Sequence, residues 1–145
     1  MRIVLQRVTR AAVEVEGHEV SRIGTGLLAL VCIGSGDDAA VVDRAARKVA
    51  GLRLFEDAAG RMNLDLAGVG GEVLVVSQFT LLADTSRGRR PSFEGAAAGD
   101  VAAPLVELFA ERLRQAGVPV ATGRFAAHMR IELVNDGPVT LVLDF

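Results

Sequence analysis

Residues 77–81, Ser-Gln-Phe-Thr-Leu, place two hydroxyls and an amide directly after an apolar segment, and they are the first candidates for chemistry. Ser77 and Thr80 are nucleophiles by type, but a hydroxyl needs an activating partner, and the segment contains neither His nor Lys. A strand edge whose hydroxyls bond the backbone is the structural alternative. On these five residues alone, the indication of a catalytic site is weak.

Residues 135–140, Asn-Asp-Gly-Pro-Val-Thr, form the second candidate segment. Asp-Gly and Gly-Pro are both turn dipeptides, so the segment by itself predicts a hairpin turn. The bond before a proline is cis in only about 5–6% of cases in folded proteins. A cis bond between Gly137 and Pro138 therefore does not follow from this segment alone.

A third candidate is a basic cluster in a polar stretch, formed by Arg87, Arg89 and Arg90. A solvated loop explains such a cluster, and so does contact with the phosphates of a nucleic acid. The net charge of −2 argues against a general nucleic-acid binder held by bulk charge, but it leaves room for a local basic patch.

The two histidines and the single cysteine are weaker candidates for catalysis or metal binding. His128 is a general base by type, but no Asp-His-Ser arrangement is evident, and His18 lies in a predicted turn. Cys32 lies within the apolar run 27–33 and is expected in the core. A single cysteine cannot form an internal disulfide, and no residues have the spacing of a zinc site. We therefore expect no metal and no cofactor.

Hydrophobic periodicity predicts the elements that carry these residues. Helices are expected over residues 38–52, with Asp37 as the N-cap, and over residues 100–116, which Gly117 ends. A polar loop is expected over residues 84–95. The predicted strands cover residues 2–16, 19–24, 27–34, 52–55, 72–77, 129–135 and 139–144.

This order of elements predicts an α/β protein with a three-layer β/β/α arrangement, in which two main helices cover largely antiparallel, barrel-like sheets. A length of 145 residues is typical of one domain, here residues 1–145, and the 50% hydrophobic content suffices for a sizeable core. We expect a cytoplasmic protein, because the sequence shows neither a signal peptide nor an apolar run of membrane-spanning length.

Several blocks of the sequence match one known family in order and separation. Besides residues 77–81 and 135–140, they are residues 2–8 (Arg-Ile-Val-Leu-Gln-Arg-Val), 52–57 (Leu-Arg-Leu-Phe-Glu-Asp), 60–63 (Gly-Arg-Met-Asn) and 88–93 (Gly-Arg-Arg-Pro-Ser-Phe). Over essentially its whole length the chain resembles the D-aminoacyl-tRNA deacylases, editing enzymes that hydrolyse the ester between a D-amino acid and tRNA.

The resemblance implies a homodimer without a metal cofactor, in which a cis Gly-Pro motif of one subunit reaches into the pocket of the other. Gly137 and Pro138 would be the chiral selector, and Arg7 would hold their loop in place. The remaining implied roles are an ester pocket lined by Ser77, Gln78, Phe79 and Thr80, and contacts of Phe125 and Met129 with the terminal adenine. Apart from the resemblance, the basic cluster in an otherwise slightly acidic chain favours contacts of Arg87, Arg89 and Arg90 with phosphates of the tRNA acceptor end.

Chirality gives this assignment a physical basis. Enantiomers carry the same groups, so only a rigid, asymmetric wall can separate them. Two parallel carbonyl oxygens of a cis Gly-Pro turn can accept from the substrate ammonium and crowd the direction of an L side chain, and Gly137 allows close approach. Glycine has no side chain to reject, so glycyl-tRNA mischarged on tRNA-Ala is a second expected substrate.

The hydrolytic step leaves two routes open. Backbone N–H groups near Phe79 and Thr80 can stabilise the oxyanion that forms when water attacks the ester. Thr80 is the nucleophile by type, whereas the family resemblance favours help from the 2′-hydroxyl of the terminal ribose.

Ala126 and His128 stand where the family pattern often has glycine and aspartate, so the loop next to the adenine pocket is expected to differ locally. Two alternative functions are an ester hydrolase of the same fold with relaxed chirality, and a non-enzymatic dimeric RNA-binding domain. The intact residues 77–81 and 135–140 argue against the second alternative.

Overall fold

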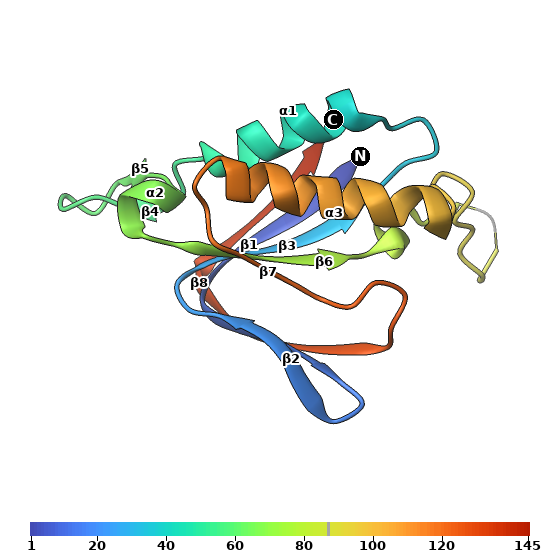
Figure 1. The fold of residues 1–145 in the computed structure, drawn as a ribbon, viewed down its shortest axis with the longest axis horizontal. Coiled ribbons are helices and arrows are strands. Elements are labelled where there is room, and N and C mark those ends of the chain that lie inside the picture. Colours follow the sequence, from blue (N-terminus) through green and yellow to red (C-terminus); the bar gives the residue numbers. More distant parts are fainter. Residues whose placement is uncertain (87) are drawn as a thin grey trace.

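One mixed sheet with the strand order β2-β1-β3-β6-β7, to which β8 is added through β1, forms the framework of the protein (Figure 1). The computed structural model describes residues 1–86 and 88–145, so the predicted contact residue Arg87 lies outside the described residues. The strands are β1 (Arg2–Val15), β2 (His18–Ile23), β3 (Gly26–Cys32), β4 (Phe55–Glu56), β5 (Met62–Leu64), β6 (Glu72–Ser77), β7 (Val120–Thr122) and β8 (Met129–Asp144). The helices are α1 (Ala39–Ala50), α2 (Leu66–Val69), the 3-10 turn η1 (Phe79–Leu82) and α3 (Gly99–Gln115).

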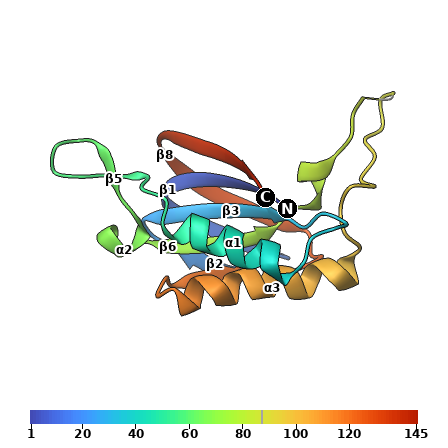
Figure 2. The same ribbon diagram turned by 90° about the horizontal axis from the view of Figure 1, so that it is seen from above.

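Two apolar clusters on opposite faces of the sheet define three layers. The first lies between the sheet and the helices α1 and α3, which run side by side across one face (Figure 2). The second lies between β3 and β6 and the part of β1, β2 and β8 that folds over them. The pairs of β1 with β2, β3 and β8 are antiparallel, and β3–β6 and β6–β7 are parallel. The predicted three-layer α/β architecture is confirmed.

Strand β1 passes from one cluster to the other along its length. Ile3 and Leu5 in its first half pack in the cluster under the helices, whereas Val8 and Val13 in its second half pack in the other. The crossing falls at Arg7, where the pairing with β8 is irregular. A bulge bends a strand and increases its twist, so this irregularity coincides with the bend that turns one sheet into two layers.

The prediction of a hairpin turn at residues 135–140 was wrong. Residues 129–135 and 139–144 belong to one strand, β8, and both halves pair with β1 in the same antiparallel sense. Gln6 pairs with Thr140 and Val8 pairs with Asn135, so the extra residues of β8 bulge out opposite Arg7. The long partner strand β1 supplies ladder bonds on both sides, and this tertiary pairing overrides the local turn chemistry.

The two main helices occur where periodicity predicts them, but the expected cap of the first was wrong. Asp38, not Asp37, caps α1, and its carboxylate accepts from the N–H of Val41 at 3.0 Å. Asp37 instead accepts from the N–H of Gly34 at 2.5 Å in the preceding turn. Val42 and its helical neighbours Ala45, Ala46 and Val49 are buried, as the amphipathic pattern requires.

Short elements escaped the sequence prediction. The pair β4–β5, the helix α2, the turn η1 and the strand β7 each have two to four residues, too few to show a period. The strand expected at 52–55 is reduced to Phe55–Glu56. Among the described residues, no helix is long and apolar enough to cross a membrane.

Candidate functional site

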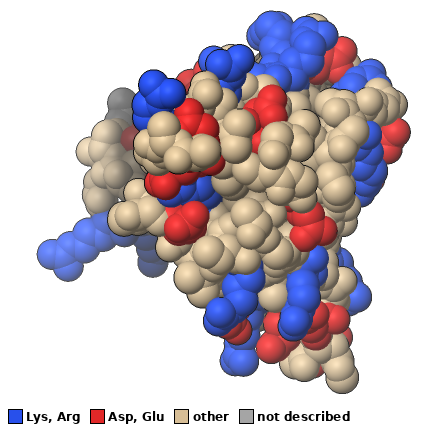
Figure 3. All heavy atoms as spheres, turned by 90° about the vertical axis from the view of Figure 1, so that its left-hand side faces the viewer, with Lys and Arg blue, Asp and Glu red and all other residues tan. Residues whose placement is uncertain are grey.

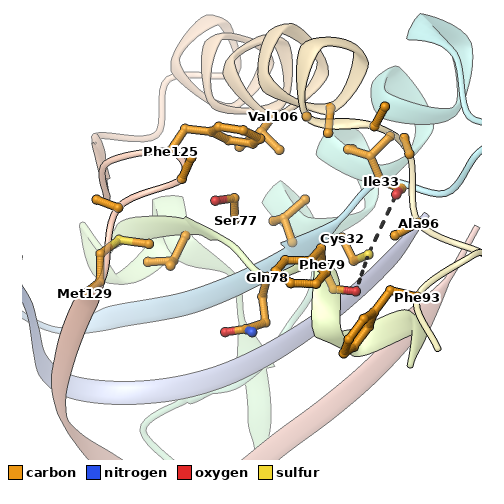
Figure 4. A pocket seen from close by; sticks show the side chains of 18 of the residues that line it. Cys32, Ile33, Ser77, Gln78, Phe79, Phe93, Ala96, Val106, Phe125 and Met129 are labelled. Atoms are coloured by element: carbon orange, nitrogen blue, oxygen red, sulfur yellow. Dashed lines mark hydrogen bonds between the residues drawn. The ribbon is translucent and has the colours of Figure 1, made fainter. Parts of the chain in front are cut away.

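A cavity of about 700 Å³ opens at the carboxyl ends of β3 and β6 (Figure 4). These two strands are parallel and end together, with Val31 beside Ser77. Their continuations then diverge, which leaves the kind of crevice in which open α/β sheets bind ligands. Phe125 and Met129 lie on one side of Ser77, and Phe79 and Phe93 lie on the other (Figure 4).

The turn η1 forms one wall through Phe79, and its first two residues, Phe79 and Thr80, are exposed. Its register is set by the N–H of Gln78, which donates to Val31 at 2.8 Å. The first N–H groups of a helix have no acceptor within that helix, which applies here to Phe79 and Thr80. Phe79 is 57% exposed, and its ring meets that of Phe93 edge to face with the ring centroids 4.9 Å apart.

Thr80 is not a lining residue of this cavity, although Ser77, Gln78 and Phe79 are. It is exposed, and its hydroxyl accepts a hydrogen bond from the side-chain amide of Gln78. An amide cannot take up a proton as a general base, so this contact holds the hydroxyl without activating it. A nucleophilic role of Thr80 gains no support from its surroundings.

Cys32 lies at the floor of the cavity and was expected only in the core. Its thiol donates to the carbonyl oxygen of Phe79 at 3.3 Å (Figure 4). Burial raises the pKa of the Cys32 thiol above its ordinary value, so the group stays a neutral donor and a poor nucleophile. Its contact links the end of β3 to the turn η1.

The opposite wall is a loop that comes very close to its neighbours. A Cβ on Gly123 would lie 2.8 Å from the sulfur of Met129, so a larger residue there would have to displace the end of the Met129 side chain. Phe125 lies beside Gly99 at the start of α3, 3.7 Å from where a Cβ would stand. Ala126 has a φ of +60°, a left-handed conformation that favours glycine.

The Gly137–Pro138 segment is a braced protrusion. The peptide bond is cis, and both residues are exposed on the bulge of β8. Arg7 is only 5% exposed, and its guanidinium donates to the carbonyl oxygens of Leu54 at 2.6 Å and Asp136 at 3.1 Å. The Asp136 carboxylate lies 3.2 Å from the same guanidinium. Charged hydrogen bonds thus fix both the backbone and the side chain beside Gly137.

The cavity and the bulge lie at opposite ends of the sheet in one chain. On β3, Arg7 pairs with Leu27 and Arg2 pairs with Cys32 at the cavity floor. Five residues of strand correspond to about 17 Å at ~3.3 Å per residue. The structure therefore brings Ser77, Gln78 and Phe79 together with Phe125 and Met129, and leaves Arg7, Gly137 and Pro138 apart from them.

Several lining residues were missed by the sequence reasoning. Phe93 packs edge to face against Phe79 on the same side of the cavity, and the only signal for it is a single aromatic residue within a polar loop. Residues 96–99, including Gly99, line the rim between that loop and α3. Arg89 and Arg90 are exposed in the loop. None of the described residues form a group of three or more metal-ligating side chains.

The family model and two highly similar relatives all point to one family of enzymes. The family model described as D-Tyr-tRNA(Tyr) deacylase matches residues 4–144. A D-aminoacyl-tRNA deacylase of Thermomicrobium roseum is 60% identical over 99% of this chain and 94% of its own length, and one of Salmonella typhimurium is 55% identical over 97% of both.

Two solved structures share the fold. A c-Myc DNA unwinding element binding protein superposes with a TM-score of 0.94 at 37% identity, covering 100% of this chain and 99% of its own. A probable eukaryotic D-amino acid tRNA deacylase has a TM-score of 0.87 at 20% identity, covering 99% and 98%. The family model over nearly the whole chain and the closely identical relatives show that this protein belongs to the D-aminoacyl-tRNA deacylase family of hydrolases.

Proposed function

We propose that the cavity binds the aminoacylated 3′-terminal adenosine of D-aminoacyl-tRNA and that the protein hydrolyses its ester. The observation that carries this proposal is the aromatic lining of the cavity beside η1, whose first two residues are exposed. A volume of about 700 Å³ suits a small-molecule site. Phe125, Phe79 and Phe93 offer rings on which a base can stack, and Met129 adapts to its edge.

For the hydrolytic step, water adds to the ester carbonyl, and the bond to the ribose oxygen then breaks to release the D-amino acid and tRNA. The N–H groups of Phe79 and Thr80 would stabilise the oxyanion of the intermediate. Because the Thr80 hydroxyl is held by an amide, we assign activation of the water to the 2′-hydroxyl of the terminal ribose. No protein nucleophile is required in this scheme.

The chiral selector would come from a second copy of the chain. Within one chain the bulge is about 17 Å of strand away from the cavity, and Pro138 protrudes into solvent. A dimer would bring this bulge over the partner's cavity, where its carbonyl oxygens accept from the substrate ammonium and exclude an L side chain. Glycyl-tRNA mischarged on tRNA-Ala would also be cleaved, since glycine has no side chain to exclude.

Hydrolysis of D-tyrosyl-tRNA and L-tyrosyl-tRNA by the purified protein tests the proposal. We expect release of tyrosine from the D-substrate alone. Cleavage of both at similar rates would favour the ester hydrolase with relaxed chirality, and cleavage of neither would favour an RNA-binding domain. Phe125→Ala should raise KM for the D-substrate about 5- to 100-fold, the usual range for a lost stacking ring, and Val142→Ala on the far part of β8 is the control.

Two further variants separate the proposed roles. Thr80→Val, which removes the hydroxyl and keeps the shape, should retain substantial turnover; complete loss would make Thr80 the nucleophile. Pro138→Ala should lower the ratio of D- to L-tyrosyl-tRNA cleavage, whereas Val134→Ala on the same strand should leave the ratio unchanged. A protein that is monomeric in analytical ultracentrifugation yet stereospecific would overturn the cross-subunit selector.

A further inference from the structure

The Lys and Arg side chains divide into two populations that differ in their partners. Each arginine of β1, β2, β8 and α3 lies within salt-bridge distance of a carboxylate, and these are Arg2, Arg7, Arg10, Arg22, Arg112, Arg114 and Arg130. By contrast, no ion pair within the described residues involves the basic residues on α1 and just beyond its end, namely Arg44, Arg47, Lys48 and Arg53. We call these four residues the α1 basic face.

The α1 basic face is one surface and not scattered charge. Arg44, Arg47 and Lys48 are exposed and recur at three- and four-residue spacing, opposite the buried Val42 and Val49. No described element covers this side of α1 (Figures 1 and 2). Basic side chains gather along the upper edge of the molecule in Figure 3, which corresponds to the helix layer of Figure 1.

No carboxylate of α1 compensates this charge. Its single acidic residue, Asp43, faces the neighbouring helix and accepts from Arg112 at 2.7 Å. The favourable effect of basic residues at a helix C-terminus explains Arg47 and Lys48 in the last turn. It does not explain Arg44, which lies a turn earlier, or Arg53, which lies beyond the helix.

We propose that the α1 basic face binds phosphates of the duplex part of tRNA while the 3′ end occupies the cavity; this inference rests on the proposed function. A protein of net charge −2 gains no attraction to RNA from its overall charge. Uncompensated cations gathered on one face supply that attraction locally, and phosphate contacts of this kind account for most sequence-independent affinity.

The position of α1 fits one substrate spanning both sites. The backbone of Gly34, just before α1, bridges to Ala96 at the edge of the cavity. Arg44 to Lys48 lie five to nine residues from the first residue of α1, or about 8–14 Å along its axis. The other arginines that form no ion pair within the described residues, Arg89, Arg90 and Arg124, lie in the two loops that border the cavity.

A charge-matched pair of triple variants tests the inference. Arg44→Gln, Arg47→Gln and Lys48→Gln together remove three charges from the α1 basic face. The control, Arg10→Gln, Arg22→Gln and Arg130→Gln, removes three exposed arginines that are ion-paired. Both proteins have the same net charge, so a difference between them reports where the charge is needed. Thermal unfolding by circular dichroism verifies that both remain folded.

The first readout is hydrolysis of D-tyrosyl-tRNA and of D-tyrosyl-adenosine, which lacks the duplex. We expect the α1 variant to raise KM for D-tyrosyl-tRNA about tenfold at low salt and to flatten the slope of log KM against log salt by about 2–3, since each phosphate contact contributes about 0.7–0.9. Its kcat, and its hydrolysis of D-tyrosyl-adenosine, should match those of the control. Equal KM values for both variants on tRNA, or impaired hydrolysis of D-tyrosyl-adenosine, would overturn the inference.

Binding of uncharged tRNA separates this inference from the proposed function. The dissociation constant, measured against salt concentration by fluorescence anisotropy, does not depend on catalysis. If the unmodified protein cleaves neither substrate, the proposed function fails, and weaker tRNA binding by the α1 variant alone would still support the basic face. Equal tRNA binding by both variants would overturn the proposed role of the α1 basic face without affecting the proposed hydrolase function.

Discussion

The cavity and the Gly137–Pro138 bulge belong to the same sheet but are held in opposite ways. The cavity is walled mainly by apolar side chains, which come from strand ends, loops and the helix α3, and its rim residues Phe79 and Phe125 are 57% and 39% exposed. The bulge is braced from below by the buried Arg7 through charged hydrogen bonds to two carbonyl oxygens. One region offers adaptable surface, and the other offers fixed backbone.

Two residues in positive-φ conformations show the same contrast. Ala126 on the cavity rim has a φ of +60° and is exposed. Gly137 has a φ of +127°, and a Cβ there would lie 2.7 Å from a methyl of Val139 and 3.1 Å from the Arg7 guanidinium. Under the proposed function, the hollow that would receive the ligand can tolerate local misfit, whereas the wall that would exclude L-amino acids has to be fixed from several directions.

Removing the brace should have the largest effect. Arg7→Met leaves the carbonyl oxygens of Leu54 and Asp136 without their donor, and we expect a loss of about 3 kcal/mol in the free energy of unfolding. Urea denaturation at fixed protein concentration measures it. Arg10→Met, which breaks an exposed pair with Glu132, should cost under about 1 kcal/mol. Similar losses for the two variants would mean that Arg7 is not a structural brace.

A side chain at Gly137 should have the next largest effect. Gly137→Ala combines an unfavourable φ with contacts shorter than van der Waals distance, so we expect a loss of about 2 kcal/mol or more. Gly17→Ala is the matched control, because Gly17 has a φ of +81° but nothing within 4 Å of its Cβ position. If both substitutions cost the same in urea unfolding, crowding by Val139 and Arg7 contributes nothing.

The parts of the fold that could be predicted from sequence are those with a long local pattern. Long periodic segments gave β1, β3, β6, α1 and α3 close to their observed bounds, because burial of one face dominates their sequence pattern. Residues 77–79 were placed correctly at the end of a buried strand. The continuity of β8 was not predicted, since it depends on pairing with β1 across more than a hundred residues of chain.

The cavity walls resisted prediction for a related reason. Phe93 and Gly99 belong to a loop and a helix start that meet η1 only in the folded chain, and no local pattern reports such a meeting. The support of Phe79 by Cys32 was missed because an apolar run indicates only burial for a cysteine. The role of Arg7 in holding the Gly-Pro loop was expected only from the family resemblance, since the alternation of apolar and polar residues along a strand does not place a buried arginine opposite a bulge.

A smaller effect is expected on the adaptable side. Ala126→Gly removes a Cβ from a left-handed residue, which should stabilise the protein by about 0.5–1 kcal/mol after the added flexibility of the unfolded chain is offset. Ala127→Gly, the neighbour without a positive φ, should destabilise it instead. The midpoints of urea unfolding give both values. If Ala126→Gly instead destabilises the protein, the loop at the cavity rim is held as rigidly as the Gly137–Pro138 bulge, and the contrast between the two regions fails.

The smallest expected effect is a dependence of stability on pH. It distinguishes the two regions because the cavity rests on a neutral thiol, that of Cys32, whereas the bulge rests on the charged guanidinium of Arg7. Burial raises the pKa of the Cys32 thiol in the folded protein, whereas the unfolded chain ionises near the usual value of about 8.5. Above that pH the unfolded state releases a proton that the folded state keeps. Stability should therefore decline as pH rises until the folded thiol also ionises.

The Cys32 contribution is isolated by difference. Urea unfolding of the unmodified protein and of Cys32→Ala between pH 7 and 10 should show a steeper alkaline decline in the protein that retains the thiol. Alkylation of Cys32 by iodoacetamide should also remain slow at pH 8, since the thiolate is the reactive form. Parallel pH profiles, or rapid alkylation, would show that the cavity floor is solvated and open. The carbonyl oxygen of Phe79 would then lose its hydrogen bond from the Cys32 thiol. The cavity would be held by fewer contacts than the structure indicates, and it would differ even more from the bulge that Arg7 fixes.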